Sequence, residues 1–216
     1  MIERDSEDQR TVVNTERLRR VIKLGGSLLT FESLGPTFRQ WLSNQPPSLN
    51  LVVVGGGEQV EKIRQDQDVY GWSDEDCHVR ALQAMGGTSH FAADVLQVPR
   101  TDDQKSALDW LRTQTVQSQV GRSPSQSKAI AMVFDLSLLA LQDLTLPRNW
   151  DLTSDSLAAW LAQRWSIPEL VLMKSRSAPA DWTPKSGDFI DWVDPLFPKF
   201  AAGLRVNCVN LRALQT

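Results

Sequence analysis

Two glycine-rich stretches are the places where this chain is best equipped for chemistry. The first, VIKLGGSLLT (residues 21–30), runs from an apolar segment with Lys23 into Gly25, Gly26 and Ser27. Glycine permits a sharp turn and leaves backbone N–H groups bare, and such groups beside a lysine attract anions such as phosphate. The alternative interpretation is a tight strand-to-helix turn with an exposed lysine. The stretch has neither a Gly-Lys-Ser/Thr sequence nor a G-x-G-x-x-G sequence, so two common phosphate loops are excluded.

The second stretch, LVVVGGGEQV (residues 51–60), places Gly55, Gly56 and Gly57 after another apolar run. Glycine in a regular element costs about 1 kcal/mol, so stability explains three in a row poorly. They suit a loop where a ligand approaches the backbone. Ligands of α/β proteins gather at the carboxyl ends of strands, and we therefore expect both turns to face one cleft.

A third segment, TSDSLAAWLAQRW (residues 153–165), has the pattern of a capped helix with one apolar face. Thr153 or Ser154 is placed to cap it, and Asp155 falls in its first turn. An ordinary core helix explains this pattern by itself.

The elements that must position these residues alternate along the chain. Apolar runs of strand length lie at residues 21–24, 51–54, 130–134, 170–173 and 206–209. Helical patterns lie at residues 36–44, 59–67, 74–98 (interrupted near Gly86 and Gly87), 107–114 and 154–165. The strand runs show little polar alternation, which is typical of strands covered on both faces. We predict a three-layer α/β/α sandwich with a mostly parallel central sheet.

Composition argues against several kinds of partner. Of 216 residues, 41% are apolar and 23% charged, and a net charge of −3 offers no basic surface to nucleic acid. No run reaches the length of a membrane span, and the polar first residues do not form a signal peptide, so we expect a cytoplasmic protein without a membrane partner. Cys77 and Cys208 match no metal motif, and we predict no metal ligands among the side chains.

We expect residues 1–17 to form a mobile leader and residues 18–216 a single domain. The polar stretch at residues 113–128 predicts a surface loop or a joint between two lobes.

Taken together and in order, the three segments resemble the motifs of the amino acid kinase family. This family includes acetylglutamate, aspartate, uridylate, carbamate and isopentenyl phosphate kinases. Its K-x-G-G-S motif is matched at residues 23–27, its strand followed by GGG at residues 51–57, and its x-D-x-x-A-x-x-L-A pattern at residues 154–162. The resemblance implies an amino acid kinase-like fold, a homo-oligomer, and transfer of phosphate from ATP, with Mg²⁺, to a small anionic substrate.

The resemblance also implies that the first lobe, about residues 18–120, binds the acceptor and that the second, about residues 129–216, is a shortened nucleotide lobe. It implies roles for single residues as well. Lys23 and Asp155 would be catalytic, with the aspartate aligning the lysine. The ATP phosphates would be held by Gly25, Gly26, Ser27 and Lys174, and the acceptor by Gly55, Gly56, Gly57 and Ser154.

Residues 72–96 and 193–204 are similar to an archaeal-type branch of the family that includes a kinase for an aminomethylfuran phosphate in methanofuran synthesis. His78 and Met85 match this branch, and a core or surface histidine is the alternative for His78. The chain departs from the family after residue 173, where MKSRSAPADW replaces an Asp-Val-Asp-Gly loop. Lys199 is a candidate for the second catalytic lysine, with a solvated surface lysine as the alternative.

Three functional hypotheses follow. The chain is an ATP-dependent kinase for a small phosphate or carboxylate, or a lapsed kinase that still binds an anion, or a subunit whose nucleotide lobe a partner completes. Under the first hypothesis, we expect replacement of Lys23 to abolish transfer with little loss of stability, because its side chain is predicted to be exposed.

Overall fold

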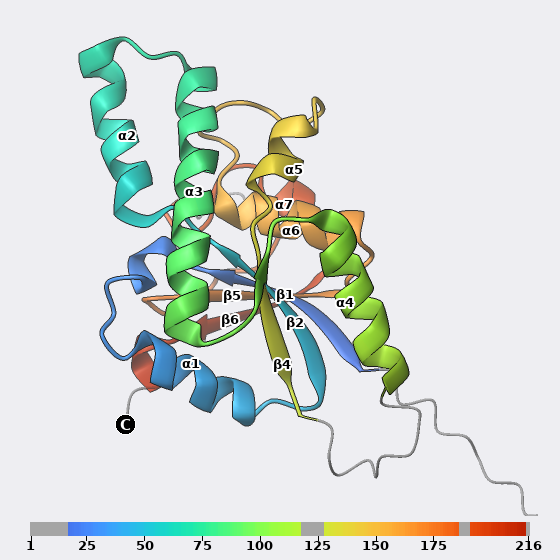
Figure 1. Cartoon of the computed structure of the whole chain (residues 1–216). Helices are drawn as coiled ribbons and strands as arrows, with labels where there is room; N and C mark the ends of the chain where they lie inside the picture. The colour runs from blue at the N-terminus through green and yellow to red at the C-terminus, as the bar shows by residue number, and fades with distance from the viewer. Residues whose placement is uncertain (1–16, 118–127, 186–190, 215–216) are drawn as a thin grey trace, which may run out of the picture.

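The computed structural model describes residues 17–117, 128–185 and 191–214, which are built around one parallel sheet (Figure 1). The strand order is β3-β4-β2-β1-β5-β6, and every neighbouring pair is parallel. The strands are β1 (Leu18–Leu24), β2 (Ser48–Val54), β3 (Arg100–Thr101), β4 (Ile130–Phe134), β5 (Glu169–Lys174) and β6 (Arg205–Asn210). The five predicted strands are all present, and β3 escaped prediction because two residues carry no periodicity.

The helices agree with the predicted patterns except at their limits. They are α1 (Leu34–Ser43), α2 (Gly57–Tyr70), α3 (Asp74–Leu96), α4 (Gln104–Gln117), α5 (Ser137–Gln142), α6 (Ser154–Arg164) and α7 (Phe197–Phe200). The short helices α5 and α7 were not predicted. No helix in the described ranges combines the length and apolar character needed to cross a bilayer.

Two predictions about chain breaks are wrong. Helix α3 continues through Gly86 and Gly87 without interruption. Glycine lets the backbone of α3 pass close to Asp135 there, since a Cβ on Gly86 would lie 3.2 Å from the carboxylate of that residue. Residues 113–117 belong to α4 instead of a loop. Residues 118–127 and the predicted leader, apart from Arg17, lie outside the described residues.

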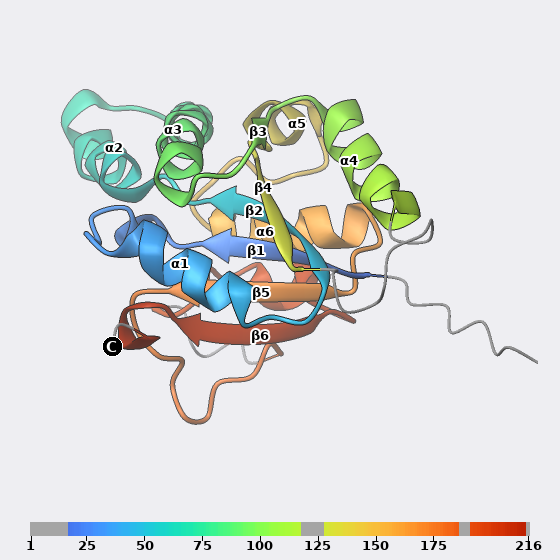
Figure 2. The same cartoon turned by 60° about the horizontal axis from the view of Figure 1, so that its bottom comes forward.

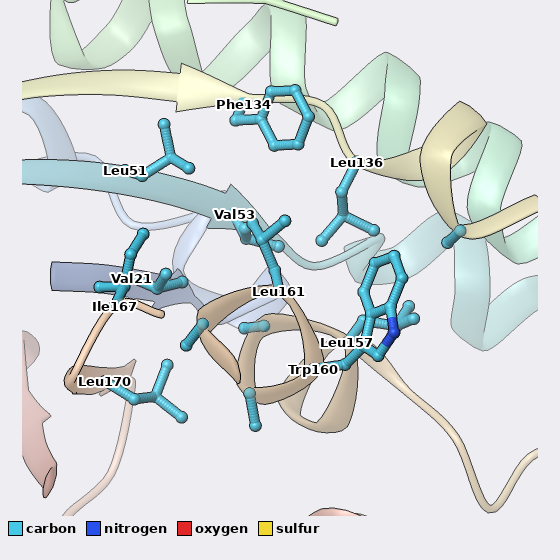
Figure 3. Packing of buried hydrophobic residues seen from close by; sticks show 14 of the residues in the cluster. Val21, Leu51, Val53, Phe134, Leu136, Leu157, Trp160, Leu161, Ile167 and Leu170 are labelled. Atoms are coloured by element: carbon cyan, nitrogen blue, oxygen red, sulfur yellow. The ribbon is translucent and has the colours of Figure 1, made fainter. Parts of the chain in front are cut away.

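Helices cover both faces of the sheet, as the three-layer prediction required (Figure 2). On one face, Ile22 and Val52 belong to a buried cluster with Phe38 of α1. On the other, Val21 and its neighbours pack with Leu161 of α6 (Figure 3). Alternate residues of the same strand thus enter different apolar layers, which explains why the strand sequences lack polar alternation.

Strand β1 lies at the centre, between β2 and β5, and its carboxyl end is therefore flanked by two others. Leu24 is paired with Val54 of β2 and with Met173 of β5. The chain continues to one side of β1 through β2 and returns on the other side with β5. Such a reversal leaves a crevice beyond the strand ends, where the ligands of open α/β sheets bind.

Candidate active site

The two glycine turns touch each other at the carboxyl edge of the sheet. A Cβ on Gly26 would lie only 2.2 Å from the backbone nitrogen of Gly57, and one on Gly55 would lie 3.0 Å from that of Gly26. Gly57 also has a left-handed backbone (φ 61°), which disfavours any residue with a side chain. Part of the glycine requirement thus comes from the contact between the turns.

Not every N–H group of these turns is free to meet an anion. Gly25 donates to the carbonyl of Met173 (2.8 Å) and Gly55 to that of Leu24 (2.9 Å), so both extend the sheet ladder. The expectation that the N–H group of Gly25 points at an anion is therefore wrong. Donors remain at the first positions of the 3₁₀ turn Gly26–Leu28 and of α2, since helix starts leave N–H groups without intrahelical partners.

Asp155 joins two lysines at the ends of neighbouring strands. Lys23 Nζ, from β1, lies 2.8 Å from Asp155 Oδ1, and Lys174 Nζ, from β5, lies 2.8 Å from Oδ2. Lys23 is only 6% exposed and Asp155 only 5%. The predicted exposure of Lys23 is wrong, because the start of α6 covers the strand end and brings the carboxylate onto it.

Electrostatics within this triad favour an ionised aspartate. Burial by itself raises the pKa of Asp155, but the nearby Lys23 and Lys174 outweigh that effect and the pKa is lowered. Burial, followed by repulsion from Lys23, lowers the pKa of Lys174 in spite of its ion pair with Asp155. The triad therefore holds an ionised carboxylate between two lysine side chains at the edge where the glycine turns meet.

The start of helix α6 is capped by a residue that lies far away in the sequence. Asp194 accepts hydrogen bonds from the backbone N–H groups of Thr153 and Ser156 and from both hydroxyls. The prediction that Thr153 or Ser154 supplies the capping side chain is wrong, since the N-cap Thr153 makes no such bond. Ser154 instead lines the cavity described next.

A cavity of about 610 Å³ opens above the glycine turns. Among the predicted site residues, those that line it are Lys23, Gly26, Ser27, Gly55–Gly57 and Ser154. Asp155, which pairs with both lysines, does not line the cavity, and neither Lys174 nor Gly25 belongs to its lining. The volume suits a small metabolite.

The wall formed by α2 and α3 has both apolar and charged groups. Leu82 and Met85 line it, and the guanidinium of Arg64 lies 4.6 Å from the ring centre of Trp150. His78 also lines the cavity and is buried; burial, then Arg148, lowers the pKa of its imidazole, against the opposing effect of Glu75.

Beyond β5, where the sequence departs from the family, aromatic residues gather. Lys174 donates to the backbone carbonyl of Trp192 and lies 4.7 Å from the centre of its ring. Trp182 packs against Trp192 and Phe197, with ring centres 6.3 Å apart in each pair. Lys199 is exposed and lies over Phe200, as the surface-lysine alternative holds.

Several residues of the site were missed from the sequence. Ser175 bonds to Ser27 through their hydroxyls (2.9 Å), and Arg212 donates to the carbonyl of Ser27 (3.1 Å). Trp150 lies in an irregular stretch before α6. The one signal available was position, since Ser175 and Arg212 both follow strand ends on the edge that holds the glycine turns.

Comparison with known proteins bears on the fold. No family model matches the chain, and no curated protein matches its sequence. The structure is similar to uridylate kinase from Archaeoglobus fulgidus, with a TM-score of 0.54 at 16% identity over 92% of this chain and 96% of that one. UMP kinase from Ureaplasma parvum gives a TM-score of 0.48 at 13% identity over 78% and 75% of the two chains. The first comparison, together with the parallel six-stranded sheet, shows that this chain has the amino acid kinase-like α/β fold of uridylate kinases.

Proposed function

We propose that this chain is a kinase that transfers the terminal phosphoryl group of ATP to a small metabolite bearing a phosphate or carboxylate. The observation that carries the proposal is the ion triad: two ammonium groups from adjoining strand ends are fixed on Asp155 beside the cavity in which the glycine turns meet.

The proposed reaction requires no covalent bond between the protein and its substrates. An acceptor oxygen bonds to the terminal phosphorus while the bond from that phosphorus to the bridging oxygen of ATP breaks, and ADP leaves. Charge spreads over the oxygens of the transferring group. Lys23 and the free N–H groups of the glycine turns are the donors that would stabilise it, and Asp155 would hold Lys23 in place.

Magnesium, which neutralises phosphate charge in such reactions, would come bound to ATP. The described residues contain no cluster of three acidic, histidine or cysteine side chains fit to hold a metal. Mg²⁺ often keeps most of its ligands from phosphates and water. A cytoplasmic homo-oligomer remains part of the proposal.

The acceptor would occupy the cavity between α2, α3 and the start of α6. Leu82 and Met85 offer it an apolar wall, and the Lys23 end offers positive charge. The name of the uridylate kinase neighbour adds UMP to the acceptors worth testing. Aminomethylfuran phosphate, predicted from residues 72–96, finds no support in the structural comparisons and enters the same test as a sequence-based candidate.

One observation favours a second candidate, an anion-binding protein without transfer. Lys174 is occupied by Asp155 and by the carbonyl and ring of Trp192. In this arrangement its ammonium is directed at the protein and does not line the cavity. A lapsed kinase would retain the glycine turns and Lys23 and lose the use of Lys174.

Nucleotide binding followed by transfer separates the two. We would titrate the protein with a non-hydrolysable Mg·ATP analogue by calorimetry and then measure ADP release from ATP with a panel of phosphate and carboxylate acceptors. A kinase is expected to bind the analogue with Kd below about 1 mM. Lys23→Met should abolish acceptor-dependent ADP release, and Lys62→Met, at a side chain 67% exposed on α2, should leave it intact. A folded protein that ignores millimolar nucleotide would exclude the stand-alone kinase.

A further inference from the structure

We infer that Arg212 is an anion-binding residue of this site, which holds a phosphate group against the first glycine turn. The inference deepens the proposed function and rests on it for the identity of the anion. It assigns a role to a residue that lies at the far end of the chain from Lys23.

The backbone around Arg212 is fixed to the sheet although the side chain is exposed. Leu211, just after β6, is fully buried and donates its N–H to the carbonyl of Lys174 (2.9 Å). Ala213 donates to the side chain of Asn210 (3.3 Å). These bonds hold the 3₁₀ turn Arg212–Leu214 beside the end of β5, and so close to the ion triad.

The side chain of Arg212 reaches back over the first glycine turn. One of its terminal nitrogens donates to the carbonyl of Ser27 (3.1 Å), and the guanidinium lies 5.7 Å from the ring centre of Phe31. Arg212 lines the cavity together with Lys23 and Gly26. A guanidinium has five N–H donors, so one bond to Ser27 leaves others for an oxyanion.

Lys23 and Arg212 flank the same turn from two sides. Lys23 Nζ would lie 3.9 Å from a Cβ on Gly25, at the beginning of the turn, and Arg212 contacts Ser27 at its end. An anion placed on the free N–H groups between them would meet an ammonium and a guanidinium. Arginine suits such a place because its planar fork binds two phosphate oxygens at once.

The cavity is lined by acidic as well as basic side chains, namely Glu58, Glu61, Lys23, Arg64 and Arg212. Asp155 lies between Lys23 and Lys174 and offsets part of their positive charge, so a bound polyphosphate would need a further cation. Arg64, on the α2 wall, forms an exposed ion pair with Glu61 at 3.5 Å. Arg212 forms no ion pair with a carboxylate of the described residues, so its charge is available to a ligand.

The test uses inorganic tripolyphosphate, which needs no acceptor and no transfer. Calorimetry would compare the full chain with Arg212→Ala, Arg212→Lys and the control Arg112→Ala, whose side chain is 73% exposed on α4. We expect Arg212→Ala to weaken binding about tenfold or more, the effect of losing a charge-assisted pair of hydrogen bonds. Arg212→Lys should recover part of the affinity, and Arg112→Ala should bind as the parent does.

Urea unfolding of the same variants separates anion binding from a structural role. An unchanged midpoint for Arg212→Ala together with weakened binding supports the inference. Three results overturn it: equal affinity in Arg212→Ala, an equal loss in Arg112→Ala, or a loss that tracks a lower urea midpoint and is not recovered by lysine. A chain that binds tripolyphosphate through Arg212 but never releases ADP would refute the kinase and leave this inference standing.

Discussion

The ammonium group of Lys23, at the end of β1, lies 2.8 Å from the carboxylate of Asp155, in the first turn of α6, and both groups are buried. Helix α6 packs on β1 and β5, so this ion pair ties a strand end to the layer that covers it. Because this ion pair is buried, the residues of the candidate site also contribute to the stability of the fold. Variants of the site must therefore be judged by stability as well as by activity.

Asp155→Asn is expected to lower the free energy of unfolding by about 3–5 kcal/mol, because it leaves two buried ammonium groups without their anion. Urea unfolding followed by circular dichroism measures the loss. The same variant should lose transfer, since Lys23 would no longer be held. A variant as stable as the parent would contradict the burial of the triad.

Glu169→Gln is the matched control for that experiment. Glu169 forms another buried ion pair with β1, to Arg20 at 2.9 Å, but at the opposite end of the strands. We expect a comparable loss of stability, again about 3–5 kcal/mol, with acceptor-dependent ADP release retained. If both variants lose ADP release equally, Asp155 acts only through the fold.

Below neutral pH, His78 is expected to make stability fall. Burial and Arg148 lower the pKa of its imidazole from 6.5, so the unfolded chain takes up the proton first as the pH drops. The contribution is complete above pH 6.5 and is lost as the pH falls through the lower pKa of the folded state. Urea midpoints between about pH 5 and 8 should fall less on the acid side in His78→Gln than in the parent.

The second histidine provides the comparison for this pH profile. His90 lies exposed on the same helix, α3. His90→Gln should keep the acid-side slope of the parent. If it removes the slope and His78→Gln does not, the assignment to the buried imidazole is wrong.

Alanine at two glycines is expected to separate the cost of a close contact from the cost of a left-handed backbone. Gly71→Ala meets no atom within 4 Å and only imposes a left-handed backbone on alanine, which costs about 1–2 kcal/mol. Gly26→Ala drives a methyl group into Gly57 and should cost about 3 kcal/mol or more, as overpacking between rigid backbones does. Thermal and urea unfolding measure the stability lost by each variant. A smaller loss for Gly26→Ala than for Gly71→Ala would show that the two glycine turns do not touch.

Trp150 is expected to report on the cavity by fluorescence. Its ring lines the cavity beside Arg64, and its indole N–H donates to Gln67 at 2.6 Å. Ligand binding should change the emission, and Trp150→Phe should remove most of that change while calorimetry still detects binding. Trp41→Phe, on α1, should keep the full signal, and an equal loss in both variants would place the ligand elsewhere.

Local patterns in the sequence determined much of the architecture. Apolar runs without polar alternation identified the five longer strands. A strand that is covered on both faces buries every side chain, so its sequence is apolar at successive positions. Glycine turns at the ends of two such runs, and an aspartate at a helix start, identified Gly26, Gly57 and Asp155. Helix limits were less accurate, since α3 runs through two glycines and α4 extends on both sides of its predicted range.

Only the tertiary structure decided which of these groups meet. Residues of β1, β5 and α6 are far apart in sequence, and parallel pairing with a covering helix brings Lys23 and Lys174 onto one carboxylate. The burial of Lys23, the capping of α6 by Asp194 and the return of Arg212 to Ser27 depend on long-range packing. No local pattern encodes them, because each is created by the approach of two segments whose separate sequences are compatible with many partners.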